Sequence, residues 1–304
     1  MRARFHVRGA RAGFYREGTH QLCDAAPTRQ LRLEAVQAVS TLAETLHAAS
    51  PDSVASISIS ENIAGSARAA HVDLAPGARI DAGVLAVACA EAGLSGISAR
   101  TAAGAYQSAG EPFVTDPLRD LTGGRVSDGE LRRHAESFFQ GNRFLIAVLV
   151  TAVMDAVPAD GDIVDLYAGV GLFSVALAAS GHLEVTAVEG DRTSGTDLRR
   201  NAQPQGPRLR AHVQGVEDYL ASRRGAPART LLVDPPRTGI SKDAMEAITA
   251  YAASRIVYVS CDPPTLARDA RRLLDSGYTL VSIRAFDLFP NTPHVETLAV
   301  FAAV

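Results

Sequence analysis

Apolar and polar residues alternate in short stretches over the first third of the chain, as in Val54–Ser60 and Ala69–Leu74. Alternation with a period of two is typical of half-buried antiparallel strands. One segment, Leu31–Ala48, instead spaces its apolar residues as an amphipathic helix does, and prolines flank it on both sides. These patterns predict a small α+β domain over residues 1–122.

The pattern changes beyond residue 122. A polar turn at Gly123-Gly124 leads into Ser127–Glu130, whose small polar residues are typical of a helix start, and the run that follows predicts a helix as far as Ala156. After Pro158, short apolar runs alternate with helical stretches. The runs predict strands at Ile163–Leu166, Val185–Val188, Leu209–Val213, Thr230–Val233, Arg255–Val259, Thr279–Ala285 and Thr297–Ala302.

Strands that alternate with helices indicate an α/β domain over residues 123–304, with a doubly wound, Rossmann-like and mostly parallel sheet. The last two predicted strands have no helix between them, so we expect an antiparallel C-terminal hairpin.

Composition narrows the class of protein. The chain has 304 residues, of which 47% are hydrophobic and 21% charged, and no apolar run approaches the roughly 18 residues of a membrane span. Its N-terminus lacks the apolar core of a secretory signal. Three widely separated cysteines match no metal or cluster motif. We therefore expect a cytoplasmic monomer with no metal site and no membrane partner, and the net charge of −3 argues weakly against nucleic acid.

A glycine loop follows the first predicted strand of the second domain. Gly169 and Gly171 stand at a strand-to-helix turn, where glycine lets the backbone approach a ligand closely. About 20 residues further on, Glu189 ends the next strand, where a carboxylate can hold the two ribose hydroxyls of an adenosine cofactor. Glycine also serves plain turns, and a dinucleotide would fit the same layout. Ser174 in the third glycine position and Asp165 inside the strand favour S-adenosylmethionine over NAD.

Two further strand ends carry reactive groups. Asp234-Pro-Pro-Arg237 is a rigid turn after the fourth strand, and it holds a carboxylate at the edge of the sheet where ligands bind. The fifth strand delivers Cys261 to the same edge, directly before a predicted helix that runs to about Ser276. A helix N-terminus favours the thiolate form of a neighbouring cysteine. We interpret Cys23 and Cys89 as inert buried cysteines.

The segment from Asp287 to Glu296 joins the last two strands and places His294 and Glu296 at its exit. Either side chain would be a general base if the segment folded over the sheet edge.

Several of these motifs together closely resemble the RNA (uracil-5-)-methyltransferases that modify tRNA and ribosomal RNA. The resemblance covers about residues 127–304, and a looser one covers Gly13–Cys23. The motifs that carry it are Phe138-Phe-Gln140-Gly-Asn142, the glycine loop, Val188-Glu189-Gly190, Asp234-Pro-Pro-Arg237, Ser260-Cys-Asp-Pro-Pro-Thr-Leu-Ala-Arg-Asp269, Asp287-Leu-Phe-Pro290 and His294-Val-Glu296.

The resemblance implies S-adenosylmethionine as cofactor, RNA as substrate, and formation of 5-methyluridine. Cys261 would be the nucleophile that adds to carbon 6 of uracil, and Glu296 the base that removes the proton from carbon 5. The cofactor and target-base pocket would be lined by Gln140, Tyr167, Gly169, Gly171, Leu172, Glu189 and Asp234. Leu172 stands where relatives often have a polar Asn.

The chain also departs from the family's pattern. It lacks the usual N-terminal β-barrel RNA-binding module and the four iron–sulfur cysteines, so we expect either a truncated chain or a short branch of the family. The densest basic stretch, Arg2–Arg16, would then either track RNA phosphates or form a solvated strand face.

Other activities stay open at this stage. Asp-Pro-Pro after the fourth strand also occurs in amino-group methyltransferases, an interpretation that leaves Cys261 and Glu296 without a role. DNA cytosine-5 methylation places its cysteine after the fourth strand, where this chain has Pro235-Pro-Arg237. An RNA-folding factor that keeps the cofactor pocket but has no turnover is the non-enzymatic alternative.

Overall fold

The computed structural model describes residues 1–16, 18–223, 226–290 and 292–304, and it divides into two compact units. Unit 1 comprises Met1–Asp116 and Arg132–Gly141, and unit 2 comprises Pro117–Leu131 and Asn142–Val304. The chain passes between the units in β8 (Phe113–Pro117) and β9 (Glu130–His134), which form a two-stranded sheet. The units thus interleave in sequence, whereas the predicted boundary at residue 122 is a single cut.

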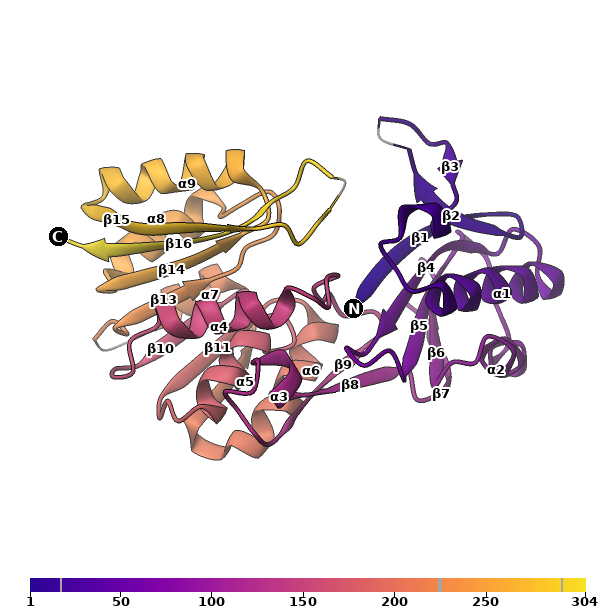
Figure 1. Ribbon diagram of the computed structural model, residues 1–304, viewed down its shortest axis with the longest axis horizontal. Coiled ribbons are helices and arrows are strands. Elements are labelled where there is room, and N and C mark those ends of the chain that lie inside the picture. The colour runs from indigo at the N-terminus through magenta and orange to yellow at the C-terminus, as the bar shows by residue number, and fades with distance from the viewer. Residues whose placement is uncertain (17, 224–225, 291) are drawn as a thin grey trace. The chain divides into compact units, whose positions relative to one another are not determined.

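Unit 1 is built on a seven-stranded sheet with the order β3-β2-β1-β4-β5-β6-β7. The sheet is mostly antiparallel, but β5 and β6 run parallel. Figure 1 shows the two longer helices beside it. The strands are β1 Arg2–Arg8, β2 Arg11–Tyr15, β3 Leu22–Cys23, β4 Val54–Glu61, β5 Arg68–Leu74, β6 Gly96–Arg100 and β7 Tyr106–Gly110, and the helices are η1 Ala26–Thr28, α1 Leu33–Ala49 and α2 Ala82–Glu91.

Alternation along the strands of unit 1 separates a core face from a polar face. In β4, Ile57 and Ile59 join the core against α1 and α2. Ser56 and Ser58 alternate with them along the strand and lie on the other face. The predicted strands at residues 54–60 and 69–74 and the helix at residues 31–48 are confirmed, with ends shifted by at most two residues.

Unit 2 contains the sheet that the apolar runs predict, with the order β12-β11-β10-β13-β14-β16-β15. Strands β10 to β14 are parallel to one another, and the β15–β16 hairpin is antiparallel, as expected. The strands are β10 Ile163–Leu166, β11 Val185–Glu189, β12 Leu209–Val213, β13 Thr230–Val233, β14 Arg255–Ser260, β15 Tyr278–Phe286 and β16 Glu296–Ala303.

Helices cover both faces of this second sheet. They are α3 Leu118–Leu121, α4 Ile146–Ala156, α5 Leu172–Ala179, α6 Arg192–Ala202, η2 Gln203–Arg208, α7 Val216–Ser222, α8 Lys242–Tyr251 and α9 Pro263–Asp275. α7, α8 and α9 share one apolar core with alternate side chains of β10, β11, β13, β14 and β16. α4 and α5 pack against each other and against β16 and β11. Within the described residues, no helix combines the length and the apolar character that a membrane crossing needs.

The helix predicted from Ser127 to Ala156 is wrong in its first half. β9 occupies its start, and α4 begins only at Ile146. Arg133 in β9 is fully buried and forms an ion pair with Asp116, so a tertiary contact overrides the local helical pattern. The Asn142 side chain accepts hydrogen bonds from two backbone N–H groups just ahead of α4, which delays the start of the helix.

Candidate functional site

Three parallel strands of unit 2 end at the same level and bring their following residues to one edge of the sheet. Leu166 pairs with Val188 on one side and with Val233 on the other. Tyr167, Glu189 and Asp234 follow these three strand positions. The backbone N–H of Asp234 donates to the Leu166 carbonyl over 3.3 Å, which continues the ladder by one residue. The predicted cofactor loop and carboxylates therefore share one edge.

The loop after β10 has an unusual backbone. Tyr167, Gly169 and Gly171 all have positive φ, at 63°, 56° and 93°. A left-handed conformation is unfavourable for a side chain such as tyrosine, and such strain is commonly held at binding sites. A Cβ at Gly169 would meet nothing within 4 Å, whereas one at Gly171 would lie 2.9 Å from Leu198 Cδ1. Glycine thus suits the two positions for different reasons. The space beside Gly169 is open to a ligand, whereas close packing at Gly171 leaves no room for a Cβ.

Glu189 braces the glycine loop. Its Oε2 accepts the Gly169 N–H over 2.7 Å, and its Oε1 accepts the Asp191 N–H over 2.6 Å. Burial raises the pKa of this carboxyl, and the backbone donors oppose the rise. The carboxylate is therefore held in place at the strand end with its orientation set by the backbone.

Asp165 lies beneath the loop and is 0% exposed. Burial raises its pKa well above the ordinary value, and the neighbouring Ser174 only partly opposes the rise. Burial and the charge of Glu189 also raise the pKa of Asp234. A buried group of carboxyls that raise one another's pKa is common at functional sites.

Cys261 and Glu296 face each other across neighbouring strands. The ladder between β14 and β16 ends at Ser260 and Thr297, Cys261 and Glu296 are the residues next to this last pair, and the charge of Glu296 acts on the Cys261 thiol. Glu296 is 1% exposed, and neither of its carboxylate oxygens accepts a hydrogen bond from any residue that the structure describes. Burial, together with the charge of Asp234, raises its pKa. His294, the other predicted base, lies two residues before the start of β16 and is half-buried.

Several groups besides the helix N-terminus act on the Cys261 thiol. Burial raises the pKa of its thiol, the charges of Glu296 and Asp234 raise it further, and Arg237 lowers it through its charge and a hydrogen bond. Two carboxylates and partial burial outweigh one guanidinium group. Arg237 is also the residue whose role sequence reasoning missed: its motif was recognised, but nothing in the sequence placed it beside the thiol.

The helix after Cys261 begins where it was predicted to begin. Asp262 is its N-cap, and its carboxylate accepts the Thr265 N–H over 3.1 Å and the Thr265 hydroxyl. Pro263 occupies the first helical position. The capped turn fixes the direction in which the chain leaves the cysteine.

The other predicted site residues have different settings. Gln140 is buried in unit 1, while Asn142 of the same motif belongs to unit 2, so the division between the units passes through that motif. Leu172 is buried at the start of α5. Their roles at the cofactor stay predictions.

The interpretation of the other two cysteines holds only for Cys89, which is buried. Cys23 is exposed, because β3 is a two-residue strand at the edge of its sheet.

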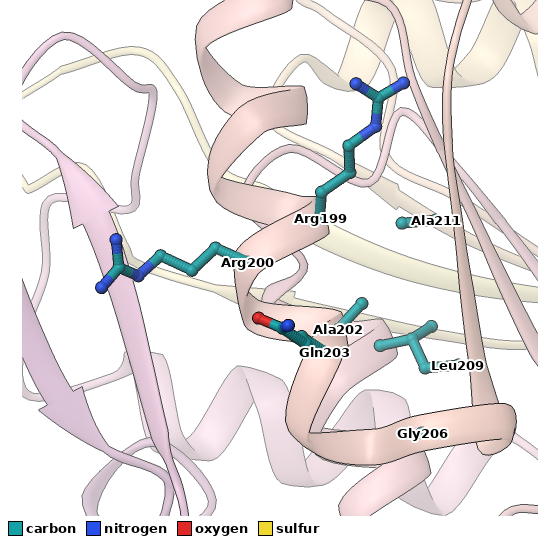
Figure 2. Close-up of a pocket in the computed structure, with 7 residues that line it drawn as sticks. All are labelled: Arg199, Arg200, Ala202, Gln203, Gly206, Leu209 and Ala211. Carbon is teal, nitrogen blue, oxygen red and sulfur yellow. The ribbon is translucent and has the colours of Figure 1, made fainter.

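A separate hollow of about 470 Å³ lies in unit 2 between α6, η2 and β12. Two arginines, Arg199 and Arg200, contribute to its lining, but Figure 2 shows their side chains extending in different directions. Their charges do not converge on a single point, so this hollow does not have the arrangement of an anion site.

The C-terminal part of the chain matches a family of known proteins. Residues 224–303 match the family model described as tRNA (Uracil-5-)-methyltransferase. An RNA methyltransferase of Thermotoga maritima, described as uncharacterized, is 39% identical over 164 residues, which are 53% of this chain and 37% of that protein. Another from Streptomyces coelicolor is 37% identical over 201 residues, or 65% of this chain and 42% of that protein. The chain thus spans about two fifths of the length of these relatives.

A solved structure is similar over nearly the whole chain. The Pyrococcus abyssi tRNA (uracil-54, C5)-methyltransferase, solved with S-adenosyl-L-homocysteine, superposes with a TM-score of 0.73 at 23% identity, covering 99% of this chain and 75% of that one. Similarity at this identity establishes the fold, and the predicted doubly wound, Rossmann-like fold with its antiparallel C-terminal hairpin is confirmed. The match of residues 224–303 and the names of the relatives likewise confirm the resemblance inferred from the sequence.

Proposed function

We propose that this chain, whose residues 224–303 match the tRNA (uracil-5-)-methyltransferase family, is an S-adenosylmethionine-dependent enzyme that forms 5-methyluridine in tRNA or ribosomal RNA. The observation that carries the proposal is that Cys261 and Glu296 lie next to the last residue pair of β14 and β16, where the charge of Glu296 acts on the thiol. A nucleophile and a base at one strand edge are what a covalent uracil mechanism requires. The relatives' names and the titles of similar structures support the choice of RNA and cofactor.

The residues present fit the proposed cofactor. Glu189 is held at the strand end next to the glycine loop, where it would bind the ribose hydroxyls, and the space beside Gly169 would admit the ligand close to the backbone. The cofactor would supply an electrophilic methyl group on a sulfonium. Tyr167, Gly171 and Leu172 belong to the same loop and helix start, and Asp234 lies on the adjacent strand end.

Cys261 would act on the target base first. Carbon 5 of uracil is a poor nucleophile, so the thiolate adds to carbon 6 and the electron pair of the carbon 5–carbon 6 bond moves to form an enolate. Carbon 5 then takes the methyl group. The pKa of the Cys261 thiol is raised, so the thiolate needs a favourable charge nearby. Arg237 is the group beside the thiol that supplies this charge.

Glu296 would complete the reaction. After methylation carbon 5 still carries its proton. Glu296 takes this proton, the electron pair of the carbon–hydrogen bond forms the carbon 5–carbon 6 double bond, and the carbon 6–sulfur bond breaks to release Cys261 as the thiolate. The burial that raises the pKa of Glu296 also makes its carboxylate a stronger base. Both of its oxygens have room for the proton, since no described residue donates to them.

The polar face of unit 1 is consistent with an RNA partner. Arg2, Arg4, His6 and Arg8 alternate with core residues along β1, so they lie on the face opposite α1 and α2. The His6 and Tyr15 rings stack with centroids 3.7 Å apart, and Arg8 lies over Tyr15. Arg4 is paired with Asp73. Arginines beside stacked rings form a surface suited to a single-stranded nucleic acid, whose target base must be unpaired or flipped out to be reached.

The test is a trapping experiment. An RNA that contains 5-fluorouridine has fluorine in place of the carbon 5 proton, so Glu296 cannot complete elimination and the RNA stays attached to the enzyme. With S-adenosylmethionine we expect a mass shift on the peptide that contains Cys261. Cys261→Ala should abolish it, and Cys23→Ala, which removes an exposed cysteine, should not.

A preparation that binds the cofactor but forms no adduct with any uridine-containing RNA would contradict the covalent mechanism. Methylation of an exocyclic amine without an adduct would instead support an amino-group methyltransferase. Mapping 5-methyluridine in total RNA with and without the gene would identify the substrate as tRNA or ribosomal RNA.

A further inference from the structure

The loop that carries Arg237 is held by α9, the helix that begins just after Cys261. The Thr265 hydroxyl lies 3.1 Å from the Arg237 carbonyl, and its single proton is shared between this carbonyl and the Asp262 carboxylate. One turn later, Arg268 donates to the Thr238 carbonyl over 3.0 Å. α9 therefore contacts the backbone of two successive residues of this loop.

Asp269 binds the same loop from inside the protein. It is 0% exposed, and its Oδ2 accepts both the Ile240 N–H and the Tyr258 hydroxyl over 2.9 Å. Its Oδ1 accepts the Arg268 Nε–H over 2.9 Å. Because Tyr258 lies in β14, one carboxylate joins the loop, the strand that leads to Cys261, and the helix that follows it. A buried charge with this many donors has a fixed position.

Gly239 shows how closely the helix and the loop approach. Its φ is 77°, and a Cβ there would overlap Thr265, Arg268 and Asp269 together. The loop thus follows a path that only glycine permits, and this path is set by the same three residues of α9.

We propose that Thr265, Arg268 and Asp269 are positioning residues that hold the loop at residues 234–240 so that the Arg237 side chain stays beside the Cys261 thiol. The charged groups that act on that thiol are Arg237 and Asp234 from this loop and Glu296 from β16. Arg237 is the cation among these three, and it acts on the thiol more strongly than Asp234 does, so a displaced loop leaves the thiol beside the Glu296 carboxylate with less compensation. The consequence for turnover rests on the proposed function, whereas the effect on the thiol does not.

The experiment measures the alkylation of Cys261 by iodoacetamide across a range of pH, with peptide mass spectrometry following Cys261 and the exposed Cys23 separately. Thr265→Val removes the hydroxyl but keeps the side-chain shape, and Thr265→Ser keeps the hydroxyl. Thr249→Val is the matched control, because the Thr249 hydroxyl bonds only to carbonyls within α8 in the described structure.

We expect the apparent pKa of Cys261 to rise in Thr265→Val and to stay near wild type in Thr265→Ser and Thr249→Val. A rise of about one unit lowers the thiolate fraction about tenfold, and the more basic thiolate recovers roughly threefold, so alkylation below the pKa should slow about threefold. Cys23 should react at an unchanged rate. Asp269→Asn should shift Cys261 in the same direction, and the Thr265 variants still test the proposal if that buried replacement does not fold.

An unchanged pH profile of Cys261 in Thr265→Val would overturn the proposal, even if methyl transfer fell. A shifted profile in a protein that never methylates RNA would support the positioning role and reject the proposed function. If both hold, kcat should fall more than KM changes, because the reactivity of the thiol is altered while the cofactor loop is untouched.

Discussion

Replacing Gly171 by alanine should destabilise unit 2 more than the same replacement at Gly169, although the two residues lie in one loop. Both have positive φ, so an alanine side chain is strained at either position by about 1 kcal/mol. The difference lies in the space that the new methyl group would enter.

The magnitude follows from the neighbours of each Cβ. At Gly169 nothing lies within 4 Å, so we expect a loss of about 1 kcal/mol in the free energy of unfolding. At Gly171 the methyl would lie 2.9 Å from Leu198 Cδ1 and 3.1 Å from Val175 Cγ2, so α5 and α6 must shift. Overpacking of this kind costs a further ~1–3 kcal/mol, so the total at Gly171 should be about 2–4 kcal/mol.

Urea unfolding followed by circular dichroism compares the two variants with the wild type, and hydrogen exchange tells which unit is affected. In Gly171→Ala, exchange should rise in peptides from β10 and α5, and the affinity for S-adenosylmethionine should fall because the helix start moves. Gly169→Ala should disturb exchange less. Equal losses of stability in the two variants, or a larger loss at Gly169, would refute the assignment of close packing to Gly171 and of open space to Gly169.

Two further predictions concern Glu296. With natural RNA, Glu296→Gln should methylate the base and then stall with the RNA still bound to Cys261, visible by denaturing gel electrophoresis; normal turnover would remove its role as base. The second prediction concerns pH. Burial raises the pKa of Glu296 and Asp234, so the folded protein retains protons at pH values where the unfolded chain has lost them. The free energy of unfolding should therefore fall as pH rises above about 4.5, the ordinary range of carboxyls. Glu296→Gln should flatten this decline in urea titrations at several pH values, and an equally steep decline in the variant would show that Glu296 does not cause it.

Contacts distant in sequence account for what the residue patterns could not predict. The guanidinium of Arg133 is buried against Asp116, and this pairing turned a predicted helix into β9. Cys23 was interpreted as buried from its residue type, but it lies on a two-residue edge strand. Burial, Glu296 at the start of β16 and Asp234 just after β13 raise the pKa of Cys261, and no local pattern places these groups beside the thiol. In each case the tertiary arrangement, and not the neighbouring residues in the sequence, decided the outcome.

By itself the sequence determined the order of strands and helices in unit 2 and the strand ends at which Glu189, Asp234 and Cys261 lie, because apolar periodicity and glycine or proline turns act within a few residues of one another. Only the tertiary structure decided that Glu296 lies beside Cys261 at the end of the β14–β16 ladder and that α9 holds the loop of Arg237, since strand register and the contacts of Asp269 join segments that no local pattern relates.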